Sequence, residues 1–179
     1  EGIRRQNAEI DAIINNPAAP TFENTIVPYE KSGELLHRVT TVFGNLLSAE
    51  TSDELQELAR EIMPLMSEHE NNISLNEKLF ARIKAAYELT DKNKLTPEQS
   101  KLLEDIYTGF VRNGANLQGD AKEKYRKLCK ELSLLTLQFS ENALKETNDY
   151  QLVLTNKSQL SGLPESAVDA AAETAQEKG

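Results

Sequence analysis

The sequence predicts an all-α fold, a multi-helix array of antiparallel helical hairpins. Apolar residues recur at the spacing of a helical face through most of the chain, and polar residues that start helices precede several of these stretches. The run YQLVL at 150–154 is the one strand-like segment. Helices therefore account for nearly all of the expected structure.

The first long helical stretch begins at Thr21, in the segment PTFENTIVPYEKSGELL. Because proline removes a backbone donor and clashes with the preceding turn, the regular helix either starts after Pro28 or bends there. The later part of this stretch carries one continuous apolar seam at positions i, i+4, i+7 and i+11, made by Leu35, Val39, Val42 and Leu46.

Two capping-box patterns predict the next two helix starts. In TSDE at 51–54 the Thr51 hydroxyl can accept from the third helical amide while Glu54 reaches back, and SLNE at 74–77 repeats the pattern. The first of these helices is expected to be interrupted or kinked near Pro64. The second carries an apolar stripe of Leu79, Phe80, Ile83 and Tyr87.

The segment TPEQ at 96–99 gives the clearest helix start. Thr96 stands at the N-cap, Pro97 at the first helical position, and Glu98 near the positive end of the helix dipole. Gly114 and Gly119 are expected to end this helix. Its apolar residues are Leu102, Leu103, Ile106 and Phe110.

The longest helix is expected from Asp120 to about Glu146. A final helix at 164–178 contains mostly alanine and acidic residues with one strong hydrophobic, Val168, so it has little apolar surface to bury. If the seam of the long helix is buried, truncating one of its side chains should cost about 2–5 kcal/mol. That seam consists of Leu128, Leu132, Leu135 and Phe139, and Leu134 and Leu137 widen it.

Composition restricts the class of protein. The 179 residues suffice for one domain or for a piece of a larger protein. The net charge of −9 argues against nucleic acid as a partner, and the apolar runs fall well short of the roughly 18 residues that cross a bilayer. Cys129 is the single cysteine, so no internal disulfide can form, and its helical setting predicts a buried or half-buried structural thiol.

The pair His69–Glu70 resembles the start of the zinc-binding motif H-E-x-x-H. That motif needs a second histidine four residues after the first, on the same helical face, and here this position is Ile73. The other histidine, His37, lies in the amphipathic stretch LLHRV, which favours a half-exposed helical position over a catalytic one. We therefore predict no catalytic residue, no cofactor-binding residue and no metal ligand in this chain.

One group of carboxylates is a candidate site for a divalent cation. Glu50, Asp53, Glu54 and Glu57 lie close in sequence but lack the alternating loop spacing and the glycine of a calcium-binding loop. Most other carboxylates alternate with lysine and arginine at i+3 and i+4, which is typical of solvated helix faces. The sequence favours a structural role for these acids.

The order of several segments resembles the N-terminal region of the thimet oligopeptidase family of zinc metallopeptidases. The resemblance is strongest to the bacterial dipeptidyl carboxypeptidase branch, the peptidyl-dipeptidases. It covers essentially the whole chain and rests on four segments that are specific together: TFENT, FVRNGANL, FSENAL and LSGLPE.

This resemblance implies a function for a larger parent protein. Such a parent would be an all-helical zinc peptidase of oligopeptides, which removes C-terminal dipeptides, with its H-E-x-x-H motif beyond this chain. The 1–179 region would be an N-terminal helical domain that is inactive alone and helps to wall the substrate channel, and helix 164–178 would lead into the catalytic region. Its partners would be the remainder of its own polypeptide and, in the parent, the oligopeptide substrate. Zinc would be a cofactor of the parent only.

Two alternatives stay open at this stage. The parent could be an endo-acting oligopeptidase with the same helical lobe, or the chain could be a stand-alone helical module that binds another protein. A bacterial cytoplasmic location is expected, with a periplasmic one left open because the chain has no initiator methionine. If the chain is part of a larger enzyme, some exposed apolar residues should contact the rest of it, and the candidates are Leu65, Met66, Leu134 and Leu137.

Overall fold

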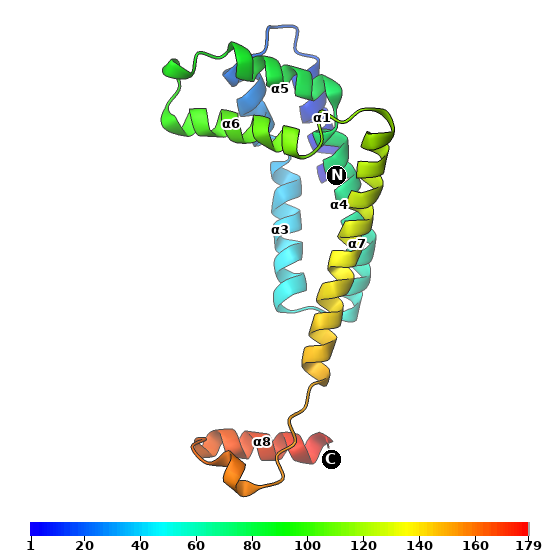
Figure 1. Cartoon of the computed structure of the whole chain (residues 1–179), viewed down its shortest axis with the longest axis vertical. Coiled ribbons are helices and arrows are strands. Elements are labelled where there is room, and N and C mark those ends of the chain that lie inside the picture. The colour runs from blue at the N-terminus through cyan, green and yellow to red at the C-terminus, as the bar shows by residue number, and fades with distance from the viewer. Residues whose placement is uncertain (179) are drawn as a thin grey trace. The chain divides into compact units, whose positions relative to one another are not determined.

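The computed structural model describes residues 1–178, and all regular structure within that range is helical (Figure 1), which confirms the predicted fold class. Short 3₁₀ turns lie at Lys92–Lys94 and Lys157–Leu160. The main elements are α1 (Gly2–Ile14), a π-helical turn (Phe22–Ile26), α2 (Val27–Lys31), α3 (Glu34–Ala49), α4 (Asp53–Ser74), α5 (Glu77–Leu89), α6 (Pro97–Arg112), α7 (Gly119–Asp149) and α8 (Glu165–Lys178).

The chain forms two compact units, Glu1–Phe139 and a second that begins at Ser140, with the boundary inside α7. The first unit holds the hydrophobic core, where α5 and α6 pair as a hairpin against the π-helical turn and α1 contacts α5. Burial of this apolar surface supplies the main driving force for folding. The core residues are Ile10, Ile13, Phe22, Ile26, Ile73, Leu79, Phe80, Ile83, Ala86, Leu103, Ile106, Phe110 and Ala115.

Aromatic rings connect α2, α5 and α6 within this core. The ring of Tyr29 meets Phe110 edge to face at a centroid distance of 5.3 Å, and Phe80 stacks on Phe110 at 6.1 Å. Tyr87 and Tyr107 stack at 4.2 Å nearer the surface. Such ring pairs add favourable geometry to the area that they bury, so they stabilise the packing of α5 against α6 and α2.

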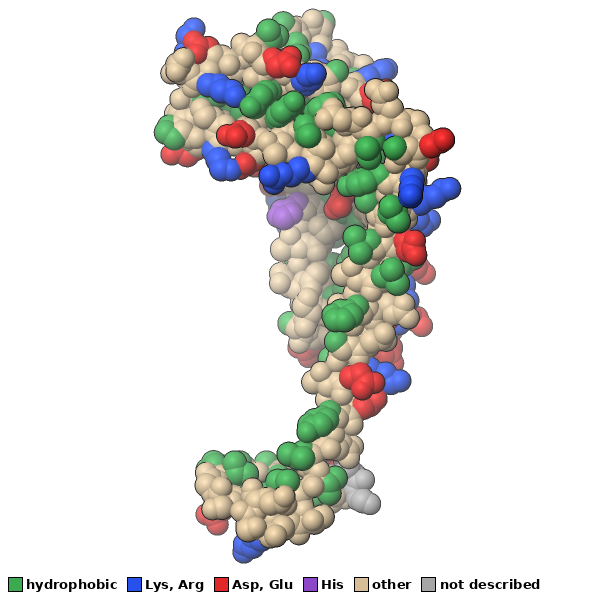
Figure 2. All heavy atoms as spheres, viewed as in Figure 1, with side chains coloured by type: hydrophobic (Ala, Val, Ile, Leu, Met, Phe, Trp, Pro, Cys, Tyr) green, Lys and Arg blue, Asp and Glu red, His purple; other side chains and the backbone are tan. Residues whose placement is uncertain are grey.

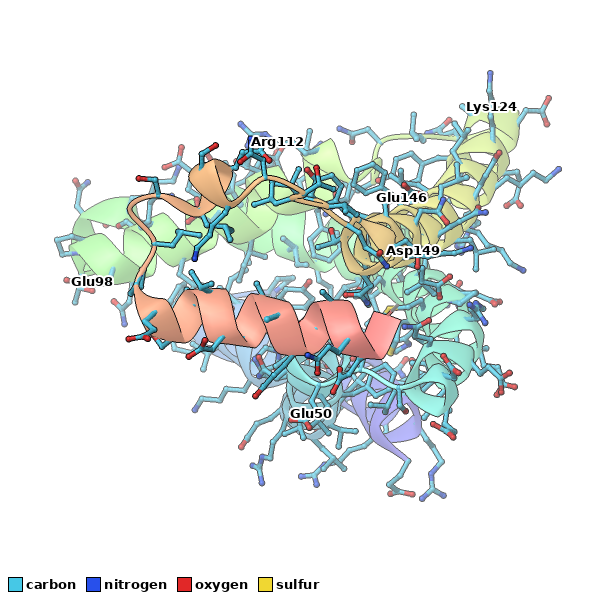
Figure 3. All side chains as sticks on the ribbon, turned by 90° about the horizontal axis from the view of Figure 1, so that it is seen from below. Glu50, Glu98, Arg112, Lys124, Glu146 and Asp149 are labelled. Carbon is cyan, nitrogen blue, oxygen red and sulfur yellow. The ribbon has the colours of Figure 1, made fainter. Side chains whose placement is uncertain are left out.

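Two helix starts lie where the sequence predicts them. Thr21 forms a reciprocal capping box with Asn24, and Thr96 forms one with Gln99, in which each threonine hydroxyl accepts an amide and each amide side chain accepts in return. Glu98 and Arg112, labelled in Figure 3, place an acid in the first turn of α6 and a base in its last turn, which favours both helix ends.

Two predicted caps are wrong by one or two residues. Ser52, and not Thr51, caps α4, because its Oγ accepts from the Leu55 amide at 3.3 Å. Asn76 caps α5 through two amides at 3.0 Å each, while Ser74 belongs to the last turn of α4. Asparagine, serine and threonine all cap helices well, so residue type alone does not decide which of the adjacent candidates is used.

The two prolines act differently. Pro28 lies in the first turn of α2, and the helical stretch breaks only after Lys31, where Gly33 adopts φ +77°. Pro64 lies inside α4, which runs from Asp53 to Ser74. Of the two expected outcomes, an interruption is therefore wrong, and a kink near Pro64 stays a prediction.

Three of the four residues in the apolar seam predicted for α3 face outward, while Leu35 is half-buried. Val39 and Val42 are each 57% exposed, and Leu46 is also exposed. The face one residue further along the sequence is half-buried instead, and consists of Leu36, Thr40, Phe43 and Leu47. Both faces have the same helical spacing, and contacts with α1 and α4 select between them.

The seam predicted for α7 is also exposed, which corrects the expectation of a buried stripe. Leu128, Leu132, Leu135 and Phe139 are between 53% and 75% exposed, and Figure 2 shows hydrophobic side chains along the visible face of this helix. Polar contacts hold α7 to the preceding helices instead: Lys122 Nζ lies 2.9 Å from Glu77 Oε1, and Arg126 Nη1 lies 2.7 Å from Asn72 Oδ1. The half-buried face of α7 is Lys122, Tyr125, Arg126, Cys129, Ser133 and Leu137.

The second unit contains the end of α7, an irregular segment and α8. Residues 150–156 have no regular secondary structure, so the strand-like run at 150–154 does not form a strand in this chain. Gly162 has φ +91°, and Pro164 accepts from two amides at the start of α8. Among residues 1–178, no helix has the length and apolar character that a membrane span requires.

Candidate functional site

A cleft in the first unit contains both histidines of the chain. Its volume is about 1070 Å³, and it lies between the turn that joins α2 to α3, the C-terminal half of α4 and the start of α7. His37 stands on the α3 side and His69 on the α4 side, with Glu70 beside it. A catalytic or metal-binding site in this unit would therefore be expected in the cleft.

His69 is a buried, hydrogen-bonded residue. Its side chain is 5% exposed, and its Nε2 lies 2.8 Å from Oε1 of Gln6 in α1. Burial lowers the pKa of His69, because the charged imidazolium loses its hydration, so the ring is neutral near pH 7. A neutral ring that donates from Nε2 to the Gln6 oxygen has already used that nitrogen, which suits a structural role.

The position four residues after His69 points into the hydrophobic core. Ile73 is 9% exposed and belongs to the core cluster of the first unit. Glu70, in contrast, is exposed on the cleft side. The residues that resemble a zinc motif thus combine a hydrogen-bonded histidine, a solvated acid and a core isoleucine. Within residues 1–178, no three side chains among His, Cys, Asp and Glu come close enough to hold a metal ion.

A contact between α1 and the α2–α3 turn forms one wall of the cleft. The Gly33 amide donates to Glu9 Oε2 at 2.8 Å, and the Gln6 side chain lies so close to Gly33 that a Cβ there would clash with it. The φ of +77° at Gly33 also favours glycine. We call this arrangement of Gln6, Glu9, Gly33 and His69 the α1 clasp, since it ties α1 to the start of α3 and to α4.

The sequence reasoning did not identify the α1 clasp. Gln6 and His69 are 63 positions apart, and nothing in the local pattern of either residue indicates the other. The one available signal was the glycine in KSGELL, which interrupts an otherwise helical stretch.

Cys129 and His37 behave as the sequence predicts. Cys129 is half-buried at the edge of the cleft, which confirms that prediction, and its neighbour Tyr125 has a raised pKa because of burial and of interaction with the thiol. His37 is exposed near the start of α3. Within the described residues, the Cys129 thiol makes no hydrogen bond to His37 or His69, so no thiol–imidazole pair is formed there.

The acidic group near the α3–α4 connection is fully solvent-facing. Glu50, labelled in Figure 3, ends α3, and Asp53, Glu54 and Glu57 lie exposed in the first turns of α4. The pKa of Glu54 is lowered, chiefly by backbone amides at the helix start and then by the Ser52 hydroxyl. These contacts assign Glu54 to the helix cap and dipole.

Extended apolar surface is the more unusual feature of the first unit. Leu65 on α4 and Leu134 on α7 are exposed, as the sequence predicted, whereas Met66 and Leu137 are half-buried. With the exposed residues of the predicted seams on α3 and α7, Leu65 and Leu134 leave large apolar side chains exposed on three helices. Extended exposed apolar surface marks a contact region more often than a catalytic one.

Comparison with known proteins gives a consistent result. Residues 3–122 match the family model described as "Neurolysin/Thimet oligopeptidase, N-terminal domain". The dipeptidyl carboxypeptidases of Escherichia coli K12 and Salmonella typhimurium LT2 are 41% and 38% identical over the whole chain, and each alignment covers 26% of the relative. Oligopeptidase A of Haemophilus influenzae is 29% identical over 95% of the chain and 25% of the relative. The chain thus spans about a quarter of the length of the curated relatives it matches.

Proposed function

The chain belongs to the neurolysin and thimet oligopeptidase family of metallopeptidases, and from this premise we propose that it is the N-terminal, non-catalytic helical domain of a zinc-dependent peptidyl-dipeptidase. The parent enzyme would remove dipeptides from the free C-termini of oligopeptides. Residues 1–179 would all belong to this domain, with α8 leading toward the catalytic region.

The similarity to dipeptidyl carboxypeptidases carries the choice of branch. Identity is 41% and 38% to the two proteins of that name, against 29% to an oligopeptidase A, over nearly the same part of the chain. The oligopeptidase A relatives keep an endo-acting parent as the second candidate.

The side chains described within residues 1–178 do not fit a zinc site, so the metal would be held elsewhere in the parent. His69 is bonded to Gln6, Ile73 lies in the core, and His37 stands exposed on a different helix. Zinc supplies a polarised water and stabilises the oxyanion that develops on the scissile carbonyl. The expected contribution of this chain is shape: helices that help to wall the channel and exclude folded proteins.

The exposed apolar stripes support a partner within the same polypeptide. The outward seams of α3 and α7 and the side chain of Leu65 would be covered by the remaining three quarters of a parent of the relatives' length. Burial of such surface is favourable at about 25 cal/mol per Å².

A bacterial cytoplasmic location fits this proposal, and cell fractionation of the parent would test it.

A pair of substrates that differ only at the C-terminus tests the activity. The purified parent should release dipeptides from a peptide with a free C-terminal carboxylate and leave its C-terminally amidated twin intact. A chelator should abolish the release, and added zinc should restore it. Internal cleavage of both peptides would favour the endo-acting alternative, and activity that survives the chelator would contradict the zinc assignment.

A further inference from the structure

The segment between α7 and α8 exposes an unusual amount of apolar surface. Tyr150, Leu152 and Val153 are 72%, 69% and 76% exposed, and Leu154 is also exposed. Figure 2 shows hydrophobic side chains along this segment. Short connections between helices are normally polar, because they run through water. Four large apolar side chains within five residues therefore point to a missing contact.

The backbone of the same segment has no partners. The Tyr150 amide donates to the Glu146 carbonyl at the end of α7. The next hydrogen bond between backbone groups runs from the Gln159 amide to the Asn156 carbonyl. Between them, residues 151–155 make no hydrogen bond within the described chain. Unpaired backbone donors and acceptors beside apolar side chains are the groups that a β-sheet neighbour satisfies.

The side-chain pattern is that of a strand with one apolar face. In an extended chain, Tyr150, Leu152 and Leu154 share one face, and the other carries Gln151, Val153 and Thr155. Tyrosine, valine and threonine favour strands, and period-two alternation is the signature of a half-buried strand.

We propose that residues 150–155 form a β-strand by pairing with a strand from the remainder of the parent polypeptide. This inference rests on the proposed function. No residue of 1–178 is in a strand, so the described chain offers no partner, whereas relatives of about four times its length do leave room for one. Two copies of this segment would form only a two-stranded ribbon, which is marginally stable in water.

Hydrogen bonds to the neighbouring helical turns hold both ends of this segment. Tyr150 closes the last turn of α7, and Asn156 caps the following 3₁₀ turn, where its Oδ1 accepts from the Ser158 amide at 3.0 Å. The five residues between these two points span about 17 Å when extended. The strand would thus connect this domain to the next part of the parent through main-chain hydrogen bonds.

Hydrogen exchange on the parent and on the 179-residue chain tests the proposal. In the parent, at least every second amide of residues 151–155 should exchange about tenfold or more slowly than in the short chain, since paired amides exchange only when the ladder opens. Amides of α8 serve as an internal comparison. Equal exchange in the two proteins would overturn the proposal. So would slow exchange in the short chain that grows with concentration, which would indicate pairing between copies, or protection that requires added oligopeptide.

Proline substitution gives a second readout with a matched control. In a strand paired along one edge, alternate amides point to the neighbour, so proline should lower the melting temperature of the parent at one of Gln151→Pro and Leu152→Pro and be tolerated at the other. Alanine at each position controls for loss of the side chain. Equal effects of both prolines, beyond those of alanine, would contradict a ladder. If the amides of residues 151–155 are protected in the parent but the parent releases no dipeptides, the strand proposal stands and the proposed enzyme activity is wrong. If the parent releases dipeptides but these amides are not protected, the activity stands and the strand proposal is wrong.

Discussion

His69 Nε2 lies 2.8 Å from Oε1 of Gln6 and so joins α4 to α1 across 63 positions of sequence. The bond occupies one of the two ring nitrogens through which histidine binds metals, and it sits at the centre of the α1 clasp, beside Gly33. The histidine that resembles a zinc ligand in the sequence is therefore a tertiary contact in the fold.

Replacing His69 with alanine should destabilise the protein without changing its metal content. The variant loses a buried hydrogen bond and leaves Gln6 without this partner, which costs about 1–3 kcal/mol in the free energy of unfolding. His37→Ala, at an exposed position, should stay within about 0.5 kcal/mol of the original. Urea unfolding measures both. Loss of stoichiometric zinc from the parent on His69→Ala would contradict this structural role.

The stability of the first unit should fall as the pH drops below about 6.5. Burial lowers the pKa of His69 in the folded state, so the unfolded chain takes up this proton first. The contribution is therefore fully present above the unfolded pKa and is lost as the pH falls toward the folded one. The free energy of unfolding, compared at pH 7.5 and pH 5.5, should decrease less in His69→Gln than in the original protein. An identical decrease in both proteins would exclude His69 as its source.

Gly33, which precedes α3, and Gly44, which lies within it, should respond in opposite directions to alanine. Gly33→Ala forces a side chain into φ +77° and against Gln6, which should cost about 1–3 kcal/mol. Gly44 lies inside α3 with open space around it, so Gly44→Ala should stabilise by about 0.5–1 kcal/mol. Thermal unfolding of the pair distinguishes the two effects. A neutral Gly33→Ala would mean that the α1 clasp does not constrain the turn.

Core and seam leucines should differ sharply in the 179-residue chain. Leu79 is fully buried in α5, and Leu79→Ala should cost about 2–5 kcal/mol. Leu132 is 63% exposed on α7, so Leu132→Ala should change stability by no more than about 0.5 kcal/mol. In the parent, the proposed contact with the remaining polypeptide should make the second substitution costly as well. A large loss for Leu132→Ala in the short chain would show that the seam is packed there.

The sequence predicts those features that depend on neighbouring residues. The Thr96 cap, the start at Thr21 and the extent of α7 follow from side chains within one or two turns, and the structure confirms them. The choice between Thr51 and Ser52 as cap did not follow, because adjacent hydroxyl groups can each reach the helix start.

Features that depend on residues far away in the sequence cannot be predicted from local sequence patterns. The seams of α3 and α7 have helical spacing, but spacing alone does not say which face meets another helix. On α3 the packed face lies one residue along, at Leu36 and Phe43, where α1 and α4 provide the partners. The run at 150–154 has strand character, yet it forms no strand because the described chain supplies no neighbour. In each case the missing information is tertiary.

The proposal that this chain is a non-catalytic domain of a zinc peptidyl-dipeptidase is tested most directly by comparing the parent with the 179-residue chain. Zinc content and released dipeptides are measured on the same samples. The parent should bind one zinc ion and release C-terminal dipeptides, and the 179-residue chain should do neither, although it is folded. Stoichiometric zinc or peptide cleavage in the short chain would contradict its assignment as a non-catalytic domain. A parent without zinc or dipeptide release would contradict the proposed enzyme.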